Sequence, residues 1–310
     1  MLLLMLLLLL APIMIHAMDA PFILDVMTRM VILSIAAVSL NLILGFGGMI
    51  SFGHAAYIGL GAYSVGIFSY YDINSAFIQL AATIAVSAIF ALITGFICLR
   101  TKGVYFIMIT LAFSQMLFFA LVSIEEYGAD DGLVINVRSE VGGPIDLENN
   151  YILYYLCVVF LSVVLWLVQR LMNSRFGMVI RGAAGNEIRL QSMGLATFHY
   201  RLMAYVIAGV ICAIAGWLLG NFTNFISPEM MDWTRSGELI FIVVLGGAGS
   251  LFGPVLGTAA FIIVEEILSG ITVHWQLYFG IFLILVVMFG KGGLSGLIDR
   301  FEEFISGPKS

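Results

Sequence analysis

Residues 77–98 read FIQLAATIAVSAIFALITGFIC and include no charged side chain. A helix needs about 20 predominantly apolar residues to cross the hydrocarbon core of a bilayer. Within that core each unpaired backbone amide costs several kcal/mol, and a helix pairs its amides internally. The run is also too continuous for a strand of a membrane barrel, in which apolar and polar residues alternate. The segment therefore predicts a transmembrane α-helix.

The composition extends this prediction to the whole chain. Of the 310 residues, 62% are hydrophobic and 10% are charged, whereas an ordinary soluble domain has about 25% charged residues. These values exclude a soluble protein, and the net charge of −6 excludes a strongly basic nucleic-acid binder. The three cysteines are an odd number and lie in apolar runs, which excludes a disulfide scaffold and indicates small core or lipid-facing residues: Cys98, Cys157 and Cys212.

Nine other apolar runs predict membrane helices. The first, Leu2–Ile15, resembles the apolar part of a secretion signal, but no Lys or Arg precedes it, so we favour a retained helix over a cleaved one. The others lie at 26–44, 54–70, 103–124, 151–169, 201–220, 238–249, 252–268 and 275–290. The expected fold is an all-α, polytopic transmembrane bundle of about ten helices, which forms a single domain over residues 1–310.

The distribution of Lys and Arg predicts the orientation. With ten crossings and a cytoplasmic N-terminus, most basic residues fall on the cytoplasmic side: Arg100, Lys102, Arg170, Arg175, Arg181, Arg189, Arg201, Lys291, Arg300 and Lys309. Arg29, Arg138 and Arg235 fall outside. Because cytoplasmic connections are normally rich in Lys and Arg, both termini are expected in the cytoplasm. The acidic loop at about 125–150 then lies outside, where it either receives a partner or is simply hydrated.

Two glycine-rich segments interrupt the apolar pattern. They are GFGGMISFG at 45–53 and GGAGS at 246–250. Small residues let membrane helices pack closely, and a break in a helix frees backbone groups that must face protein or a water-filled path. Tight packing and a discontinuous helix beside a translocation path are therefore alternative interpretations. Both predict that two backbones break or approach each other closely in these segments.

Polar side chains near these segments are candidates for lining a translocation path. They are Asn41, Ser51, His54 and Tyr57 at the first break, Gln115 in the 103–124 run, and Glu238 at the start of the 238–249 run. An ionisable residue inside a membrane is a functional candidate, and a hydrated charge at the interface is the alternative for Glu238. His54 is either a pH-sensitive group or, as we favour, a neutral ring bonded to a nearby carbonyl.

The longest predicted cytoplasmic connection, at about 171–199, contains NSRFGMVIRGAAGNEIRLQSMGLATFH at 173–199. Its apolar residues recur at helical spacing beside a face that carries Arg181 and Arg189. This pattern predicts a short amphipathic helix that lies on the membrane surface or in a groove on a partner. A solvated loop with a basic face is the alternative.

Enzymatic motifs are absent from the sequence. It has no G-x-x-x-x-G-K-[ST] phosphate loop, no H-E-x-x-H, no G-x-S-x-G and no Cys/His cluster at metal-ligand spacing. We therefore expect no catalytic residue, metal ion or cofactor in this chain, and any ATP that drives it must be hydrolysed by another subunit.

Three long segments resemble one family. SFGHAAYIGLGAY (51–63), NSRFGMVIRGAAGNEIRLQSMGL (173–195) and SPEMMDWTRSGELIFIVVLGGAGSLFGPVLG (227–257) together resemble the Liv-type permeases, the membrane subunits of bacterial branched-chain amino acid ABC importers. The likeness runs from about residue 30 to 300, with the motifs in the family's order. It implies that this chain is an inner-membrane permease subunit.

The resemblance also implies partners and a mechanism. The partners are a second homologous permease, two ATPase subunits that bind ATP and Mg, and a periplasmic substrate-binding protein. The 173–195 segment is similar to the loop that couples the family's permeases to the ATPase, and the matching positions are Gly177, Arg181, Asn186, Glu187 and Gly194. The expected function is translocation of branched-chain or related amino acids by alternating access. A similar importer for urea or short amides, and an ion-coupled transporter that works without an ATPase, are the alternatives.

Overall fold

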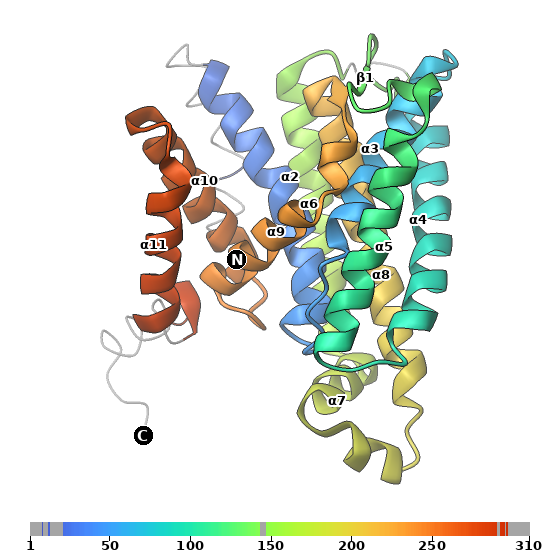
Figure 1. The fold of residues 1–310 in the computed structure, drawn as a ribbon, viewed down its shortest axis with the longest axis vertical. Helices are drawn as coiled ribbons and strands as arrows, with labels where there is room; N and C mark the ends of the chain where they lie inside the picture. The colour runs from blue at the N-terminus through green and yellow to red at the C-terminus, as the bar shows by residue number, and fades with distance from the viewer. Residues whose placement is uncertain are drawn as a thin grey trace.

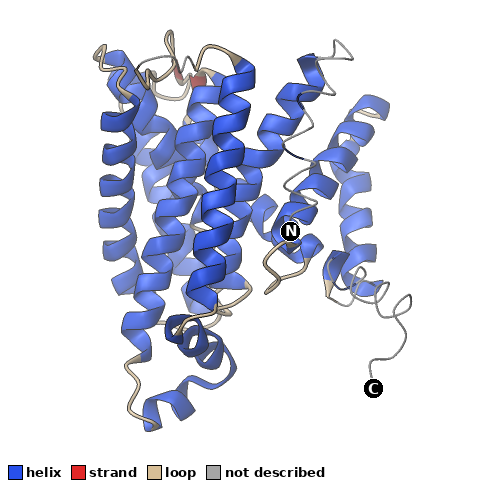
Figure 2. Ribbon diagram, turned by 180° about the vertical axis from the view of Figure 1, so that it is seen from behind, coloured by secondary structure: helices blue, strands red, loops and turns tan. Residues whose placement is uncertain are grey.

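The computed structural model describes Leu8, Pro12 and residues 21–142, 147–289, 292–294 and 296. These residues form ten α-helices: α2 (Pro21–Leu44), α3 (His54–Tyr70), α4 (Ala76–Cys98), α5 (Val104–Val122), α6 (Asn150–Met172), α7 (Arg175–Ser192), α8 (Thr197–Thr223), α9 (Trp233–Gly246), α10 (Gly253–Ile271) and α11 (Trp275–Phe289). Two short strands, β1 (Leu133–Val134) and β2 (Phe225–Ile226), pair antiparallel at one end of the bundle (Figure 2). The prediction of an all-α fold is confirmed.

Six of the described helices, α2, α4, α5, α6, α8 and α10, are long and apolar enough to cross a membrane. The protein is therefore a multi-pass membrane protein. The nine apolar runs predicted after residue 20 correspond to α2–α6 and α8–α11, with shifts of a few residues at their ends. The run expected at Leu2–Ile15 lies outside the described residues, except for Leu8 and Pro12.

One predicted boundary needs correction. The 238–249 run is shifted relative to α9, which spans Trp233–Gly246, so Glu238 lies inside a helix rather than at its start. The first turn of α9 was not predicted because its residues are polar and hydropathy alone does not mark where a helix begins.

The 171–199 connection is largely helical, since α7 occupies Arg175–Ser192. The predicted amphipathic helix is thus present in place of a solvated loop.

Helix α8 is the centre of the packing. It makes its most extensive contacts with α3, and further contacts with α2 and α4. A Cβ atom on Gly216 of α8 would lie 2.0 Å from the carbonyl oxygen of Ile58, and one on Gly61 of α3 would lie 1.9 Å from the carbonyl oxygen of Ala213. These two helices approach so closely because glycine occupies both contact positions.

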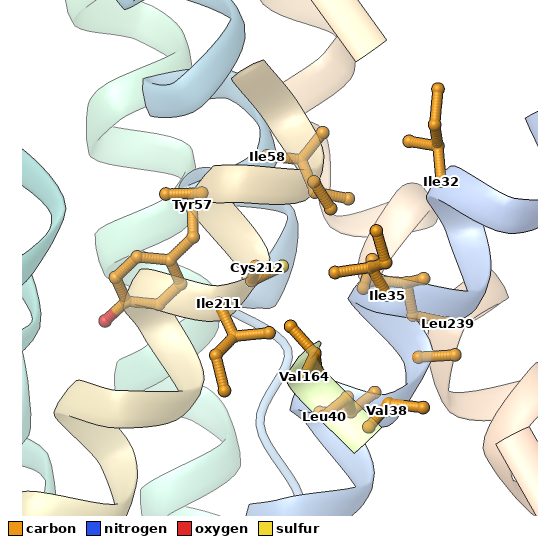
Figure 3. Close-up of a cluster of buried hydrophobic side chains, with 14 of the residues drawn as sticks. Ile32, Ile35, Val38, Leu40, Tyr57, Ile58, Val164, Ile211, Cys212 and Leu239 are labelled. Carbon is orange, nitrogen blue, oxygen red and sulfur yellow. The ribbon is translucent and has the colours of Figure 1, made fainter. Parts of the chain in front are cut away.

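The core lies where α2, α3, α6, α8 and α9 meet. Figure 3 shows part of it, with Ile35 from α2, Tyr57 from α3, Val164 from α6, Cys212 from α8 and Leu239 from α9. All five are buried. The exposed apolar residues concentrate instead on α4, α5, α10 and α11, as expected for helices whose outer faces contact lipid or another membrane subunit.

The two ends of the bundle differ in structure. At one end the 125–150 connection contains a 3-10 turn, η1 (Glu125–Tyr127), and β1, which pairs with the segment that follows α8. Ser139 in this connection donates a hydrogen bond from its backbone amide to the buried Asn221 side chain at 2.8 Å and one from its hydroxyl to Gln79. At the opposite end, α7 projects beyond the membrane-crossing helices (Figure 1). We call these the β1 end and the α7 end.

Candidate functional site

The two glycine-rich breaks meet in space. The chain leaves α2 at Leu44, turns through residues 45–53 and enters α3, while residues 247–252 connect α9 to α10. The side chain of Asn41 joins them, because its Nδ2 donates to the carbonyl oxygen of Ser250 at 2.8 Å and its Oδ1 accepts from the amide of Gly249 at 2.9 Å. A Cβ atom on Gly45 would lie 2.3 Å from the Gly249 nitrogen. The close approach of two broken backbones, predicted from the sequence, is confirmed.

Three other predicted path residues lie beside the first break, and all three are buried. Ser51 accepts a hydrogen bond from the amide of Gly53 at 3.3 Å. The hydroxyls of Tyr57 and Thr94 are 3.2 Å apart and share a hydrogen bond between α3 and α4. The hydrogen bond expected from His54 to a carbonyl is absent among the described residues, where neither ring nitrogen has a partner.

Gln115 connects α5 to the segment before α9. Its Nε2 donates to Oδ1 of Asp232 at 2.9 Å, and the neighbouring Ser114 hydroxyl donates to the carbonyl of Met231 at 2.8 Å. These bonds hold the 3-10 turn η2 (Pro228–Met231) and the first turn of α9 against the bundle. Gln115 thus positions the helix that carries Glu238.

A cavity of about 200 Å³ lies between α2, α3, α8, α9 and α10. Its charged lining residues are Arg29, Arg235 and Glu238, and its apolar ones include Ile58, Leu239, Ile242 and Phe261. Of the six predicted path residues, Glu238 is the one that lines this cavity. Arg29 and Arg235 were not among them. Arg29 could have been identified from the sequence because it lies inside the 26–44 apolar run, and a charged side chain in a membrane is costly.

Both cavity arginines are paired with carboxylates. Arg235 Nη1 lies 3.0 Å from Glu238 Oε2 on the same helix, and Arg29 Nη2 lies 3.1 Å from Glu265 Oε1 of α10. A guanidinium and a carboxylate above an apolar floor present complementary groups to a small zwitterion: the guanidinium binds its carboxylate, the carboxylate binds its ammonium group, and the floor receives an apolar side chain.

Helix α7 forms a second candidate site at the other end of the molecule. Asn186 has φ −155° and ψ 97°, which breaks α7 into two helical pieces. The Asn186 side chain then accepts a hydrogen bond from the amide of Arg189 at 3.0 Å, as the cap of the second piece. Glu187 follows directly and forms ion pairs with Lys102 at 2.6 Å and Arg201 at 3.1 Å.

The other predicted coupling residues shape the two ends of α7. A Cβ atom on Gly177 would lie 2.4 Å from the carbonyl oxygen of Met172, so only glycine fits where α7 folds back on the end of α6. Arg181 Nη2 donates to the same carbonyl at 2.5 Å. Gly194, with φ +83°, ends the segment in a left-handed conformation that favours glycine.

Large apolar side chains remain exposed on α7 and at its end. The exposed fractions are 60% for Met178, 74% for Ile188 and 70% for Met193. An apolar surface of this kind outside the membrane-crossing helices is typical of a protein–protein contact. The described structure thus combines a cavity with paired charges in the bundle and an apolar surface on a helix outside it.

Comparison with known proteins agrees with this arrangement. The sequence profile described as "Branched-chain amino acid transport system / permease component" matches residues 22–289. The chain is 25% identical to the high-affinity branched-chain amino acid transport system permease protein LivM of Salmonella typhimurium, over 87% of this chain and 69% of the relative. It is 26% identical to the Escherichia coli protein of the same name, with the same coverage.

A further relative comes from another organism. The probable branched-chain amino acid transport permease protein LivM of Methanocaldococcus jannaschii is 27% identical, over 84% of this chain and 89% of the relative. No solved structure matches the chain. Because the family profile covers nearly the whole described bundle, including both breaks, the cavity and α7, the chain belongs to the family of permease components of the branched-chain amino acid transport system.

Proposed function

We propose that this chain is a permease subunit of an ATP-driven ABC importer, built as a single transmembrane domain over residues 1–310. The observation that carries the proposal is α7, a kinked helix outside the membrane-crossing bundle whose exposed residues include Met178, Ile188 and Met193. A free-standing channel or ion-coupled transporter has no need for such a surface. An apolar helix face that enters a groove on a partner is a common mode of subunit recognition.

The partners follow from this role. A second homologous permease completes the transmembrane pore, two ATPase subunits bind ATP and Mg and receive α7, and a periplasmic binding protein delivers substrate to the β1 end. From the excess of Lys and Arg on the α7 side we infer that this side faces the cytoplasm of a bacterial inner membrane and that both termini lie on the same side. ATP hydrolysis belongs to the partners, and this chain acts as a transport subunit.

The cavity supports an amino acid as the substrate. Arg235 and Glu238 supply one positive and one negative group, and the floor supplies apolar contacts. In the absence of substrate the two charges neutralise each other, so a zwitterion exchanges one ion pair for two. Urea and short amides have no ionised groups to make this exchange, and the paired charges therefore favour branched-chain or related amino acids over them.

Transport would proceed by alternating access. Closure of the ATPase dimer moves α7, and the permease pair changes between outward-open and inward-open states. Moving a two-state gate from about 1% to about 99% open requires about 5.5 kcal/mol of differential stabilisation. Such a change would rearrange the helices on either side of the breaks at 45–53 and 247–252, which Asn41 joins. We therefore assign to the translocation path the predicted residues Asn41, Ser51, His54, Tyr57, Gln115 and Glu238.

Ile188→Asp tests the proposal. The substitution places a charge at the most exposed large apolar side chain of α7, which is 74% exposed. We expect it to abolish co-purification of the ATPase subunits and ATP-dependent uptake, while the permease pair still assembles. Val137→Asp, at an exposed apolar residue of the β1 end, far from α7, is the matched control and should retain the ATPase subunits. Full ATPase binding by Ile188→Asp would contradict the proposal.

A further inference from the structure

Glu187 does not face outward with the apolar residues of α7. Its side chain is 14% exposed, whereas that of its partner Lys102 is 64% exposed. The neighbouring Ile188 is the most exposed of the large apolar residues on this helix. The carboxylate therefore points from α7 toward the membrane-embedded bundle, and a surface that docks on α7 would meet Ile188 rather than Glu187.

Four side chains from three parts of the fold converge on this carboxylate. Lys102, in the turn between α4 and α5, lies 2.6 Å from Oε2, and Arg201 of α8 lies 3.1 Å from the same atom. Oε1 accepts from the hydroxyl of Thr197 at 3.1 Å and from Gln191 at 3.4 Å. Charge-assisted bonds of this kind are about twice as strong as neutral ones.

The kink at Asn186 explains why Glu187 reaches the bundle. A continuous helix would carry the second half of α7 straight on from the first half. The extended conformation of Asn186 redirects it, and the cap that Asn186 provides begins a new helical turn at Glu187. Asn186 thus changes the direction of the chain, and the adjacent Glu187 binds the second half of α7 to the bundle.

The attachment continues to the first glycine-rich break. Arg201 Nε also donates to Sδ of Met49 at 3.3 Å. Gly48 has φ +64°, and a Cβ atom there would lie 3.3 Å from Cβ of Ala184 in α7. A small cavity of about 70 Å³, lined in part by Gly48, Lys102 and Arg201, lies beside the contact between Arg201 and Met49. The second half of α7 and the α2–α3 connection are therefore joined through Arg201.

The charge balance keeps the carboxyl ionised. Burial by itself raises the pKa of Glu187, but the hydrogen bond from Lys102 and the positive charge of Arg201 outweigh it and hold the pKa below its ordinary value. One carboxylate faces two cations, so removal of its charge would leave Lys102 and Arg201 close together without a counter-ion.

We propose that Glu187 is an intramolecular positioning residue, which binds the second half of α7 to Lys102 and Arg201 and thereby transmits the movement of α7 to the α2–α3 break. This inference rests on the proposed function for the source of the movement, but the attachment itself is a property of this chain alone. Two roles are then separate within α7. The exposed apolar residues bind the partner, and Glu187 transmits the movement of α7 to the membrane-spanning helices.

The attachment is tested first on the full chain in lipid nanodiscs, without ATPase subunits. Lys102→Gln removes one partner of Glu187 at an exposed position and leaves the sequence of α7 unchanged. Trypsin cleavage after Arg189, in the second half of α7, should become about 5-fold faster or more, since a lost tether raises the open population. Cleavage after Arg181, in the first half, should not change. Lys102→Arg is the conservative control, and an unchanged rate after Arg189 in Lys102→Gln would overturn the proposal.

Transmission is tested in the complete transporter, by the amount of substrate moved per ATP hydrolysed. Glu187→Gln should leave the ATPase subunits bound but lower this ratio about 5-fold or more, within the usual range of coupling between distant sites. Lys102→Gln should lower it too, and the double substitution should add little to the larger single effect. Glu266→Gln, an exposed carboxylate at the β1 end, controls for loss of charge. A wild-type ratio in Glu187→Gln, or loss of ATPase binding, would overturn the proposal.

The same experiments separate this inference from the proposed function. If the wild-type complex shows no ATP-dependent uptake, the proposed function fails, and the trypsin rates still decide whether Glu187 holds α7. If uptake is ATP-dependent and the ratio does not respond to Glu187→Gln, the proposed function stands and the positioning role fails.

Discussion

Replacing Asn41 by Ala should destabilise the bundle by about 2 kcal/mol. The Asn41 side chain is 1% exposed, and it pairs one backbone donor and one backbone acceptor of the α9–α10 connection, the amide of Gly249 and the carbonyl of Ser250. A backbone group left without a partner costs about 1–3 kcal/mol when it is buried, and because both groups here are partly buried, the lower value of about 1 kcal/mol applies to each. The two groups lie in a turn packed against α2, where no other described side chain replaces these bonds.

The cysteines provide the assay. All three are buried in the folded chain, so a fluorogenic maleimide reacts with them only after the bundle opens, and the labelling rate reports the free energy of opening. Ser39→Ala is the matched control on the same helix. The Ser39 hydroxyl donates at 2.6 Å to the Ala36 carbonyl within α2, and its other contact is with the Cys212 thiol of α8 rather than with either glycine-rich break. Its loss should cost at most about 1.5 kcal/mol.

The comparison between the two variants decides the result. We expect Asn41→Ala to label at a clearly lower temperature than Ser39→Ala, because only the first substitution separates the two glycine-rich breaks. If the two variants label at the same temperature, the side chain of Asn41 does not hold the breaks together and the account of this region is wrong.

Three further predictions concern helix packing, the cavity and pH. Gly216→Ala should strongly reduce the yield of folded protein, because the new methyl group would lie 2.0 Å from a carbonyl oxygen of α3, whereas Gly270→Ala, with open space around it, should fold normally; size-exclusion chromatography distinguishes the two. Arg235→Gln should raise the KM for leucine uptake by about 10-fold or more, since a charge-assisted hydrogen bond contributes about 1.5–3 kcal/mol, and an unchanged KM would remove Arg235 from the substrate site. Because the pKa of Glu187 is held below its ordinary value of 4.5, the attachment of α7 should be complete above that value and be lost as the pH falls through the lower, folded-state pKa. The difference in opening temperature between wild type and Glu187→Gln should therefore be constant from about pH 8 to pH 5 and narrow only at more acidic pH.

Much of the fold could be predicted from the sequence because membrane burial imposes one dominant pattern. Long uncharged runs located α4 and α8 within a few residues. The glycine-rich segments at 45–53 and 246–250 predicted two breaks, and the breaks are present and in contact. These features depend on local composition, which a single sequence contains.

The candidate sites were less predictable, because partners of charged residues come from distant parts of the chain. Glu238 was selected from its place in an apolar run, but its cavity neighbours Arg29 and Arg235 became apparent only once α2 and α9 were seen to line the same space. Glu187 was assigned to coupling by resemblance. Its inward direction depends on the backbone conformation of Asn186 and on Lys102, far away in the sequence, and no periodic pattern contains that information.

The most direct test of the account is uptake of labelled leucine into lipid vesicles that contain this chain, a second homologous permease and the ATPase subunits. The account predicts uptake that requires both ATP at the α7 side and a leucine-loaded binding protein at the β1 side, and that persists when ionophores collapse all ion gradients. Uptake by this chain without ATPase subunits, driven by an ion gradient and abolished by the ionophores, would contradict it.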